Sequence, residues 1–413
     1  MDKITIRKIG PIDDVSFILN KMNVFIGPQS SGKSTIAKII SYCKWVEKRF
    51  ILDGEYNDDF AEKFMEFHRV SDSYFYNNSY IKYESDSVII EYKGYSHEQN
   101  ISKVNDGLNY TNSKNIYIPA ERNFVSAIEN LRKYKRTNDN IMNFVYDWAE
   151  IRDNYPLDKK YSILNLDVSY YYVSESDADM LSLDKEGKNL KLNNASSGLQ
   201  SLVPLLLPLE YMTGDLFDIK NMESVDEKLE MANLFFTYFN QLIDDKTRKE
   251  ELLSELKEKK GTINLTDEEY KKLFAILSSR REYHHSQFIF EEPEQNLFPE
   301  TQRELVYYMV EKLMSNNREH RLLLTTHSPY ILYALNNCML AGLVYNKMRE
   351  QDKQRVKCSS ALITPNKVSI YQIDNGKVEG IQQPDGLIGN NYFDNKMKDL
   401  MDDFYVMLNY YGK

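Results

Sequence analysis

Residues 24–35 read VFIGPQSSGKST, and their types and spacing suit the binding of phosphate groups. The segment fits the pattern G-x-x-x-x-G-K-S/T, in which glycines let backbone N–H groups wrap closely around phosphate oxygens. Lys33 would reach the β- and γ-phosphates of a nucleotide, and the Ser34 hydroxyl would coordinate magnesium. The pattern predicts a site for ATP and Mg²⁺ that is held by Gly27, Pro28, Gln29, Ser30, Ser31, Gly32, Lys33, Ser34 and Thr35.

Two adjacent carboxylates, Glu291 and Glu292, follow the apolar run FIF and would lie at the C-terminal end of a strand. Open α/β sheets bind their ligands at that end. One carboxylate can join the magnesium shell while its neighbour orients or deprotonates an attacking water. An acidic loop in solvent is the structural alternative, and the phosphate-binding pattern earlier in the chain favours the catalytic interpretation.

His327 stands in LLLTTHSPY, also directly after a short apolar run. An imidazole at a strand end can hydrogen-bond to a γ-phosphate or to the attacking water, and a purely structural hydrogen bond is the alternative. The other histidines, including His284 and His285, have no partner at the spacing of metal ligands and are expected on the surface.

The segment SSGLQ precedes a strongly apolar helix, so Ser196 and Ser197 are suited to cap its first turn. The same helix N-terminus could instead serve an anion. The segment in isolation favours the capping interpretation.

The elements that position these residues follow from the periodicity of the chain. The opening KITIRKIGPIDDVSFILNKMNVFIG predicts two or three short strands that lead into the phosphate loop, and residues 36–70 predict helix. Further strands are expected in YIKYESDSVIIEYKG, NIYIPAERN and LDVSYYYV. Because strands alternate with helices, we expect a mostly parallel sheet covered by helices.

The composition restricts the class of protein. With 413 residues, 42% hydrophobic and 28% charged, the chain suits a soluble globular protein with one large core or two modest ones. No apolar run is long enough to cross a bilayer and the start lacks a signal-peptide core, so we expect no membrane contact and a cytoplasmic location. The three cysteines form no C-x-x-C pair, which argues against a disulfide framework or zinc hook. A net charge of -10 argues against nonspecific wrapping of nucleic acid but leaves DNA binding through a local basic patch open.

In order along the chain, GPQSSGKST, SSGLQS, FIFEEPEQNLFP and TTHSPY resemble the motifs of ABC-type ATPases of the overcoming-lysogenization-defect group, relatives of SMC-like DNA-repair ATPases. This resemblance implies an α/β chain with the ABC-type ATPase fold: a mixed, mostly parallel sheet, an N-terminal antiparallel β element and a helical insertion. Residues 1–413 would form a single ABC-type ATPase domain, with the insertion at 220–286 and an α/β extension at 345–413.

The resemblance also implies roles for individual residues. Ser197 and Gly198 would belong to the signature loop, which contacts the γ-phosphate of ATP bound to the opposite subunit. Glu291 would take the Walker B position on magnesium, together with Ser34. The remaining implied roles are a catalytic base, a switch histidine and a dimer-contacting loop, at Glu292, His327 and residues 294–298.

Two departures from the family pattern imply slow hydrolysis or a long-lived ATP state. Leu199 stands where the second signature glycine is usual, and Glu291 replaces the usual aspartate. The Q-loop glutamine has no clear counterpart in the chain. YIPAERNF resembles a recurring element of the group, and Glu121 or Arg122 is expected either near the nucleotide or in an ordinary surface ion pair.

The short segment after His327 shows no Glu followed by Asp-x-Asp on a strand, which the metal site of a Toprim nuclease would require. Such a chain is similar to ATPases of bacterial anti-phage systems, including Septu and retron-associated ones. The resemblance therefore implies a homodimer or higher homo-oligomer that hydrolyses ATP and gates a separate nuclease or toxin. A standalone DNA-repair or recombination ATPase that clamps DNA, and a nuclease with an unrecognised metal site, are the alternatives.

Residues 220–286 are mostly charged and helical in pattern. Connections this long in compact domains usually carry function, and alternating charges suit specific, salt-sensitive contacts. We expect a docking surface for a second copy or an effector here, with a solvated helical hairpin as the alternative.

Overall fold

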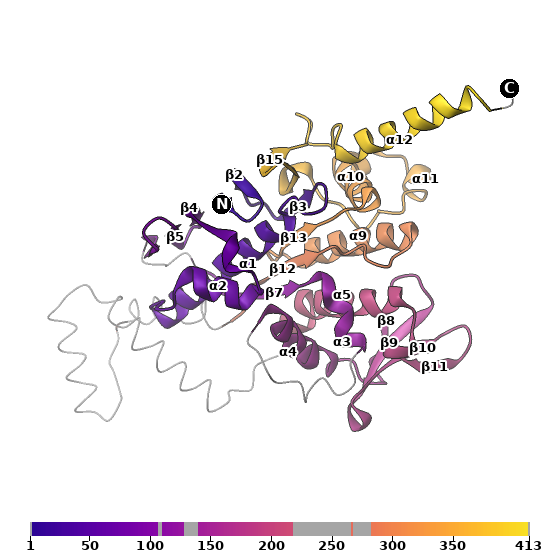
Figure 1. Ribbon diagram of the computed structural model, residues 1–413. Coiled ribbons are helices and arrows are strands. Elements are labelled where there is room, and N and C mark those ends of the chain that lie inside the picture. Colours follow the sequence, from indigo (N-terminus) through magenta and orange to yellow (C-terminus); the bar gives the residue numbers. More distant parts are fainter. Residues whose placement is uncertain (1, 106–109, 128–138, 218–265, 267–281, 412–413) are drawn as a thin grey trace.

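The computed structural model describes residues 2–105, 110–127, 139–217, 266 and 282–411 of the chain (Figure 1). The expected helical insertion and docking surface at 220–286 therefore lie outside the described residues, apart from Thr266 and the stretch that begins at Glu282.

Within the described residues, a six-stranded sheet forms the centre of the fold, in the order β15-β14-β3-β13-β12-β7 (Figure 1). Its strands are β3 (Met22–Ile26), β7 (Ser113–Ile118), β12 (His285–Glu291), β13 (Arg321–Thr325), β14 (Val368–Asp374) and β15 (Lys377–Gly380). The five strands from β14 to β7 pair in parallel, and β15 is an antiparallel edge strand. Continuous apolar runs such as LLL suit strands that are covered on both faces. The expected mixed, mostly parallel sheet is confirmed.

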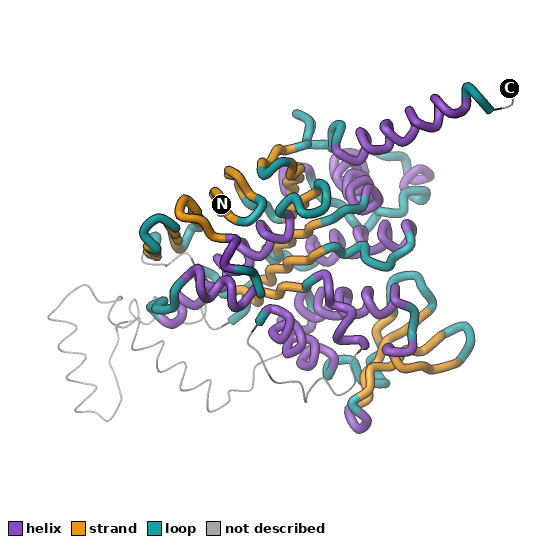
Figure 2. The backbone as a smooth tube through the Cα atoms, viewed as in Figure 1, coloured by secondary structure: helices purple, strands orange, loops and turns teal. Residues whose placement is uncertain are grey.

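Two antiparallel sheets flank this centre, as the orange segments of Figure 2 show. The first has the order β2-β1-β4-β5-β6 and confirms the expected N-terminal antiparallel element, which extends further along the chain than the opening hairpin. Its strands are β1 (Lys3–Ile9), β2 (Ile12–Ile18), β4 (Phe75–Glu84), β5 (Val88–Lys93) and β6 (Glu98–Lys103). The second contains β8 (Tyr161–Ser162), β9 (Val168–Val173), β10 (Ala178–Leu183) and β11 (Lys188–Lys191).

Most helices of the described residues cover the two faces of the central sheet. The described helices are α1 (Lys33–Asp53), α2 (Phe60–His68), α3 (Phe124–Ala127), α4 (Asn140–Arg152), α5 (Ser197–Thr213), α9 (Pro299–Met314), α10 (Pro329–Val344), α11 (Glu350–Lys353) and α12 (Tyr392–Leu408). Short 3₁₀ turns occur at η1 (Asp72–Tyr74), η3 (Ala120–Asn123), η5 (Ser174–Ser176), η6 (Leu192–Asn194), η7 (Asp215–Phe217), η8 (Tyr345–Lys347) and η9 (Pro365–Lys367).

Successive residues of the central strands point into two different cores. Val24 of β3 packs in the core that holds apolar residues of α4, α5, α9 and α10. Its neighbour Phe25 packs in the core that holds apolar residues of α1, α2 and the N-terminal antiparallel sheet. Because side chains alternate along a strand, the parallel sheet separates these two cores. The helix α12 projects from the body, and none of its residues is buried (Figure 1).

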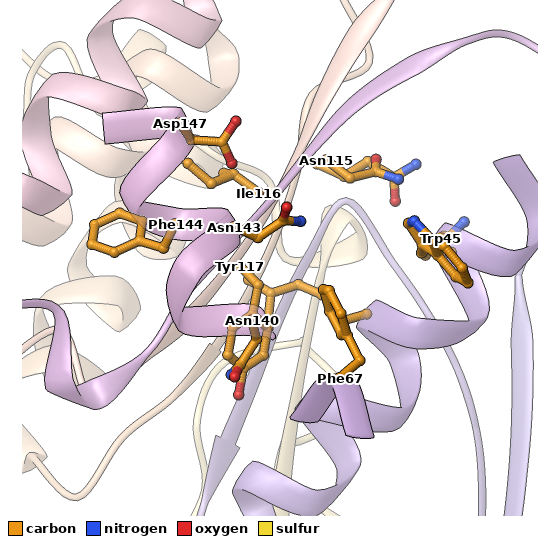
Figure 3. A pocket seen from close by; sticks show the side chains of 13 residues that line it. Trp45, Phe67, Asn115, Ile116, Tyr117, Asn140, Asn143, Phe144 and Asp147 are labelled. Carbon is orange, nitrogen blue, oxygen red and sulfur yellow. The ribbon is translucent and has the colours of Figure 1, made fainter. Parts of the chain in front are cut away.

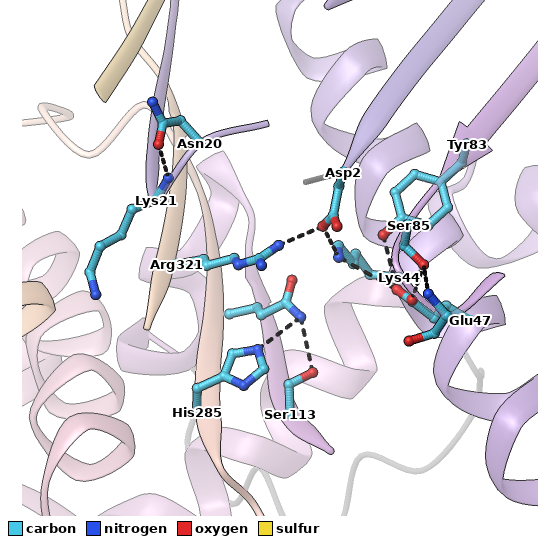
Figure 4. Close-up of polar contacts among 12 residues, drawn as sticks. Asp2, Asn20, Lys21, Lys44, Glu47, Tyr83, Ser85, Ser113, His285 and Arg321 are labelled. Carbon is cyan, nitrogen blue, oxygen red and sulfur yellow. Dashed lines mark hydrogen bonds and ion pairs between the residues drawn. The ribbon is translucent and has the colours of Figure 1, made fainter. Parts of the chain in front are cut away.

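A buried polar cluster ties the start of the chain to the helix that follows the phosphate loop (Figure 4). Asp2 is only 3% exposed; it accepts a hydrogen bond from Arg321 of β13 at 2.5 Å and contacts the Lys44 ammonium of α1. Burial would raise the pKa of Asp2, but the charges of Lys44 and Arg321 outweigh it and lower the pKa to about 2. The cluster therefore connects β13 and α1 through an ionised carboxylate.

Several histidines that were expected on the surface are buried. His285 was expected on the surface, but it begins β12, is 9% exposed, and has a pKa that burial lowers to about 3. His68 and His320 are also buried, so the surface expectation was wrong for these residues. Their neighbours in sequence include charged residues, and only tertiary packing covers them. All three cysteines are buried free thiols.

No described helix combines the length and the apolar character that a bilayer crossing needs. No group of three or more His, Cys, Asp or Glu side chains in the described residues is placed to hold a metal ion.

Candidate functional site

The phosphate-binding pattern forms a tight loop between β3 and α1. Gly27 has φ 146°, and a Cβ there would lie 2.2 Å from the carbonyl oxygen of Ile373. Gly32 has φ 105°, and a Cβ there would lie 2.4 Å from Ile12 Cδ1. Both positions thus require glycine for conformational and steric reasons. The loop ends where α1 begins at Lys33, so the N-terminus of this long helix points at the loop.

The Lys33 ammonium lies inside the loop. Its Nζ donates to the carbonyl oxygens of Gly27 at 3.0 Å and Pro28 at 2.6 Å. Burial lowers the pKa of Lys33 to about 8, although the charges of Glu292 and Glu294 oppose this shift. A phosphate group would offer this ammonium an anionic partner in place of neutral carbonyls.

Strand pairing brings the acidic pair and the histidine to the same edge of the sheet. Glu291 pairs with Thr325 across β12 and β13, and Thr325 pairs with Phe25 of β3. Because these strands are parallel, the residues that follow them meet near the phosphate loop. His327 Nε2 lies 3.5 Å from Glu292 Oε1.

Glu292 is ionised and oriented by its neighbours. Its Oε2 accepts a hydrogen bond from Gln295 Nε2 at 2.8 Å. The hydrogen bond with His327 is the largest cause that lowers the pKa of Glu292, and burial acts in the opposite direction. The hydrogen bond from Gln295 and the charges of His327 and Lys33 lower the pKa further, to about 2. The backbone of Glu292 has φ 45°, a left-handed conformation that non-glycine residues seldom adopt.

Glu291 lies deeper than Glu292, at 5% exposure. Its Oε2 accepts from the backbone N–H of Ala120 at 3.3 Å, and its Oε1 has no hydrogen-bond partner within the described residues. The Tyr117 hydroxyl is near this carboxylate but not in hydrogen-bonding geometry. A buried carboxylate oxygen without a partner, together with the hydroxyl of Ser34, is the kind of hard oxygen donor that Mg²⁺ takes.

The loop opens into a cleft of about 710 Å³. The expected residues that line it are Gln29, Ser30, Ser31, Gly32, Lys33, Ser34, Thr35, Glu292 and His327. Glu291 and residues 197–198 are not among the lining residues. The cleft therefore joins the phosphate loop, one carboxylate and the histidine of the same chain.

One wall of this cleft is formed by residues that the sequence did not predict at the site. Gly10 and Pro11 come from the turn between β1 and β2, and Ser73, Tyr74 and Tyr76 come from η1 and the start of β4. A Cβ on Gly10 would lie 2.5 Å from the ring of Tyr74, so the two segments are in close contact. The Gly-Pro turn was visible in the sequence, but nothing local showed that it faces the phosphate loop.

The signature segment begins α5 as expected. Ser196 is the N-cap residue, yet its side chain makes no capping hydrogen bond, and Ser197 is exposed. A Cβ on Gly198 would lie 3.0 Å from the carbonyl oxygen of Asn296, and the Asn296 amide donates to Ser201 Oγ at 2.9 Å. The first turn of α5 therefore packs on the loop of residues 294–298.

YIPAERNF forms the end of β7 and η3, next to β12. Arg122 is 1% exposed and donates to backbone carbonyls, so the surface ion pair considered for it is wrong. Glu121 is exposed and does not line the cleft. The segment thus reaches the C-terminal edge of the sheet, where the N–H of Ala120 donates to Glu291 and Arg122 donates to the end of β12 and to the turn that follows it.

A second cavity lies between α1, α2, α4 and the strands β7 and β12 (Figure 3). Trp45 of α1 and Phe67 of α2 contribute aromatic rings to its wall, while Asn140 and Asn143 of α4 contribute amides. With a volume of about 60 Å³, it is much smaller than the cleft at the phosphate loop and has room only for a few waters.

A family model described as AAA domain matches residues 3–282 of the chain. The chain is similar to the solved SMC head domain from Thermotoga maritima, with 11% identity over 92% of this chain and 97% of that chain and a TM-score of 0.37. It is also similar to MJ1267, an ATP-binding cassette of an ABC transporter in its ADP conformation, with 11% identity over 100% of both chains and a TM-score of 0.32. A third similar structure is the recombination mediator RecF of the RecFOR pathway, with 10% identity over 92% of this chain and 97% of that chain and a TM-score of 0.32. No curated protein matched the sequence.

Proposed function

Because the chain belongs to the AAA domain family, we propose that it binds and hydrolyses ATP and acts as a homodimeric switch. The observation that carries the proposal is the convergence of Lys33, Glu292 and His327 on one cleft at the C-terminal edge of β3, β12 and β13. Each of these side chains would have a role in phosphoryl transfer to water. Lys33 would bind phosphates, Glu292 would accept a proton, and His327 would help to orient the water or the γ-phosphate.

The phosphate loop would bind the nucleotide through its backbone N–H groups and Lys33. Residues 27–35 supply the N–H groups at the start of α1, where the helix dipole adds positive potential. Lys33 would exchange its bonds to the loop carbonyls for bonds to the β- and γ-phosphates. Ser34 and Glu291 would hold Mg²⁺, which neutralises charge on the phosphates when bound.

Glu292 would orient the attacking water and accept its proton. Its carboxylate borders the cleft and is already ionised, because its pKa is about 2. A carboxylate with so low a pKa is a weak base, since proton acceptance is most effective near the working pH. We therefore expect slow turnover, with His327 helping to place the water or the γ-phosphate.

A second copy of the chain would complete the site. Ser197 and Gly198 begin a helix and do not line the cleft of their own chain. A helix N-terminus suits an anion, so this turn could contact the γ-phosphate bound to a partner subunit. Two chains related by a two-fold axis would then enclose two nucleotides, and hydrolysis would release the dimer.

We propose further that the nucleotide state of this dimer gates a separate effector in anti-phage defence. The support is the ordered set of four motifs, which resembles that of the overcoming-lysogenization-defect group. A chain of this group without the Toprim metal motif after His327 is similar to the Septu and retron-associated ATPases. The DNA-clamping and nuclease alternatives differ in their readouts, since DNA would stimulate ATP hydrolysis in the first and the pure chain would cleave DNA in the second.

The deciding experiment measures phosphate release from ATP by the purified chain, with and without Mg²⁺ and with and without DNA. Lys33→Ala should abolish ATP binding, whereas Lys38→Ala, on the same helix but outside the cleft, should not. Equal ATP binding by Lys33→Ala and wild type would contradict the site. Co-purification from the native operon, followed by identification of the bound protein, tests the effector; recovery of the chain without any partner protein would contradict the gating role.

A further inference from the structure

Arg122 joins two parts of the molecule that are distant in the sequence. Its side chain is 1% exposed and lies between the first turn of α5 and the turn that follows β12. Nε donates to the carbonyl oxygen of Ser201 at 2.9 Å, and one terminal nitrogen donates to that of Glu291 at 3.0 Å. The other terminal nitrogen donates to the carbonyl oxygens of Glu292 at 3.0 Å and Pro293 at 3.2 Å.

These bonds hold the backbone of the proposed general base. Glu292 has φ 45°, and a left-handed residue with a side chain persists only when its surroundings hold it there. Three consecutive carbonyls of this turn accept hydrogen bonds from the same guanidinium. Buried carbonyls that lose their donor are costly, so the turn would rearrange without Arg122.

The other end of the guanidinium holds the signature turn. Ser201 lies one helical turn after Ser197, at the start of α5. Two further bonds reinforce this junction: Asn296 donates to Ser201 Oγ at 2.9 Å, and Ser126 donates to the carbonyl oxygen of Gln200 at 2.9 Å. Figure 1 shows α5 beside α3, which follows η3 directly.

The shape of arginine explains why this residue type stands here. A guanidinium is a planar fork with donors in fixed directions, whereas a lysine ammonium is a point charge on a flexible stem. Burial lowers the pKa of Arg122 to about 10, against the charges of Glu294, Glu292 and Glu291, so the group stays charged near neutral pH. It can therefore bridge the two turns as one rigid piece.

We propose that Arg122 is a positioning residue that couples the signature turn to Glu292. This inference rests on the proposed function. When Ser197 and Gly198 contact the nucleotide of a partner subunit, the displacement of α5 would pass through the guanidinium to the turn after β12. Each chain would thus adjust the base of its own site according to the nucleotide in the other site, which is a coupling between two sites.

The test is a double-mutant cycle between Arg122→Lys and Ser197→Ala, read as kcat and KM for ATP in the full-length chain. Arg122→Lys should lower kcat roughly a hundredfold by misplacing the base, while the Kd for ATP stays within about twofold of wild type. Ser197→Ala should lower kcat in the wild-type background and have at least about a fivefold smaller effect in the Arg122→Lys background, because the coupling is then already broken.

Arg152→Lys is the matched control. Arg152 is also a buried arginine, at 2% exposure, but it bonds Asp177 and Asp179 beside the second antiparallel sheet. The effects of Arg152→Lys and Ser197→Ala on kcat should multiply within about twofold, as they do for independent sites. Arg122 has only a structural role if the effects of Arg122→Lys and Ser197→Ala on kcat also multiply. The same conclusion follows if Arg122→Lys and Arg152→Lys lower kcat to the same extent.

A second variant keeps the inference testable if Arg122→Lys does not fold. Asn296→Ala removes the weaker bond between the same two turns, and it should lower kcat and reduce the effect of Ser197→Ala without changing the Kd for ATP. Unchanged kcat with Asn296→Ala would overturn the coupling. A wild-type chain that does not hydrolyse ATP would instead overturn the proposed function, so the two failures are distinguishable.

Discussion

Glu292 and His327 show how much of the proposed catalytic site depends on individual side chains. Glu292 combines a left-handed backbone with a carboxylate whose pKa is about 2, and His327 provides the largest part of that lowering. The two residues follow different strands, β12 and β13, and His327 Nε2 lies 3.5 Å from Glu292 Oε1. Their effects on the rate can be separated, because Glu292 would act on the water directly, whereas His327 would also act by lowering the pKa of Glu292.

Glu292→Gln removes the proposed proton acceptor but keeps the shape of the side chain. We expect kcat to fall by about a hundredfold or more, while ATP binding is retained and an ATP-bound dimer accumulates. Phosphate release and size-exclusion chromatography with ATP measure both effects. Glu300→Gln, at an exposed position of α9, is the control. Hydrolysis by Glu292→Gln at the wild-type rate would show that another group accepts the proton.

His327→Ala should change the pH dependence of the rate as well as its size. Removing the hydrogen bond that lowers the pKa of Glu292 raises that pKa, and Glu292 must be ionised to accept a proton. The acidic limb of the kcat profile, measured between about pH 4 and pH 8, should therefore move to higher pH in the variant. A profile of unchanged shape and lower height would mean that His327 does not act through Glu292.

At the scale of elements, the site depends on how β13 and α1 are held together. The Asp2 carboxylate lies between Arg321 of β13 and Lys44 of α1 (Figure 4). Asp2 and Lys44 are buried, whereas the side chain of Arg321 is partly exposed. Breaking a buried pair leaves an uncompensated charge, which is strongly destabilising. The residue therefore matters to stability although it is almost the first in the chain.

Asp2→Asn should destabilise the fold by roughly 2 kcal/mol at neutral pH, as the lowering of its pKa implies. Because the folded-state pKa of about 2 is below the ordinary value of 3.8, this stability is fully present above pH 3.8 and is lost as the pH falls through about 2. Thermal unfolding of variant and wild type should therefore differ at pH 7 and converge in strong acid. Asp14→Asn, in an exposed pair with Arg7, should change stability by less than about 1 kcal/mol. A constant difference across this pH range would contradict the assignment to Asp2.

At the scale of the whole molecule, the cleft and the signature turn face different surroundings. The cleft holds the phosphate loop, Glu292 and His327, whereas Ser197 lies outside it. The two regions are connected within one chain through the Arg122 junction. A site that needs both the cleft and the signature turn thus requires a second chain, and this requirement can be tested by mixing inactive variants.

Lys33→Ala and Ser197→Arg should each be inactive alone, and their mixture should recover roughly one working site per heterodimer because each chain supplies what the other lacks. The mixing ratio should set the phosphate-release rate, with a maximum near equal amounts. A mixture of Lys33→Ala with Glu292→Gln, which both damage the same cleft, is the control and should stay inactive. No recovery at any ratio would contradict the composite site.

Local sequence determined the pieces of this site that lie within single elements. The pattern of residues 27–35 specifies its own loop, because glycine, lysine and serine at these spacings have few alternative conformations. The apolar runs before Glu291 and His327 predicted short buried strands, and parallel pairing then placed both residues at one edge. These predictions needed only periodicity and the general geometry of parallel sheets.

Tertiary structure alone decided which distant segments meet. Tyr74 and Tyr76 border the cleft because β4 pairs with β1, and nothing in their neighbourhood in the sequence indicates this. Arg122 reads as an ordinary charged residue in YIPAERNF, yet its partners are the carbonyls of Ser201 and of the turn after β12. Every residue has a backbone carbonyl, so a side chain that donates to carbonyls needs no acidic partner residue. The sequence therefore contains no sign of such a bond. Burial of such a group can be known only once the chain has packed around it.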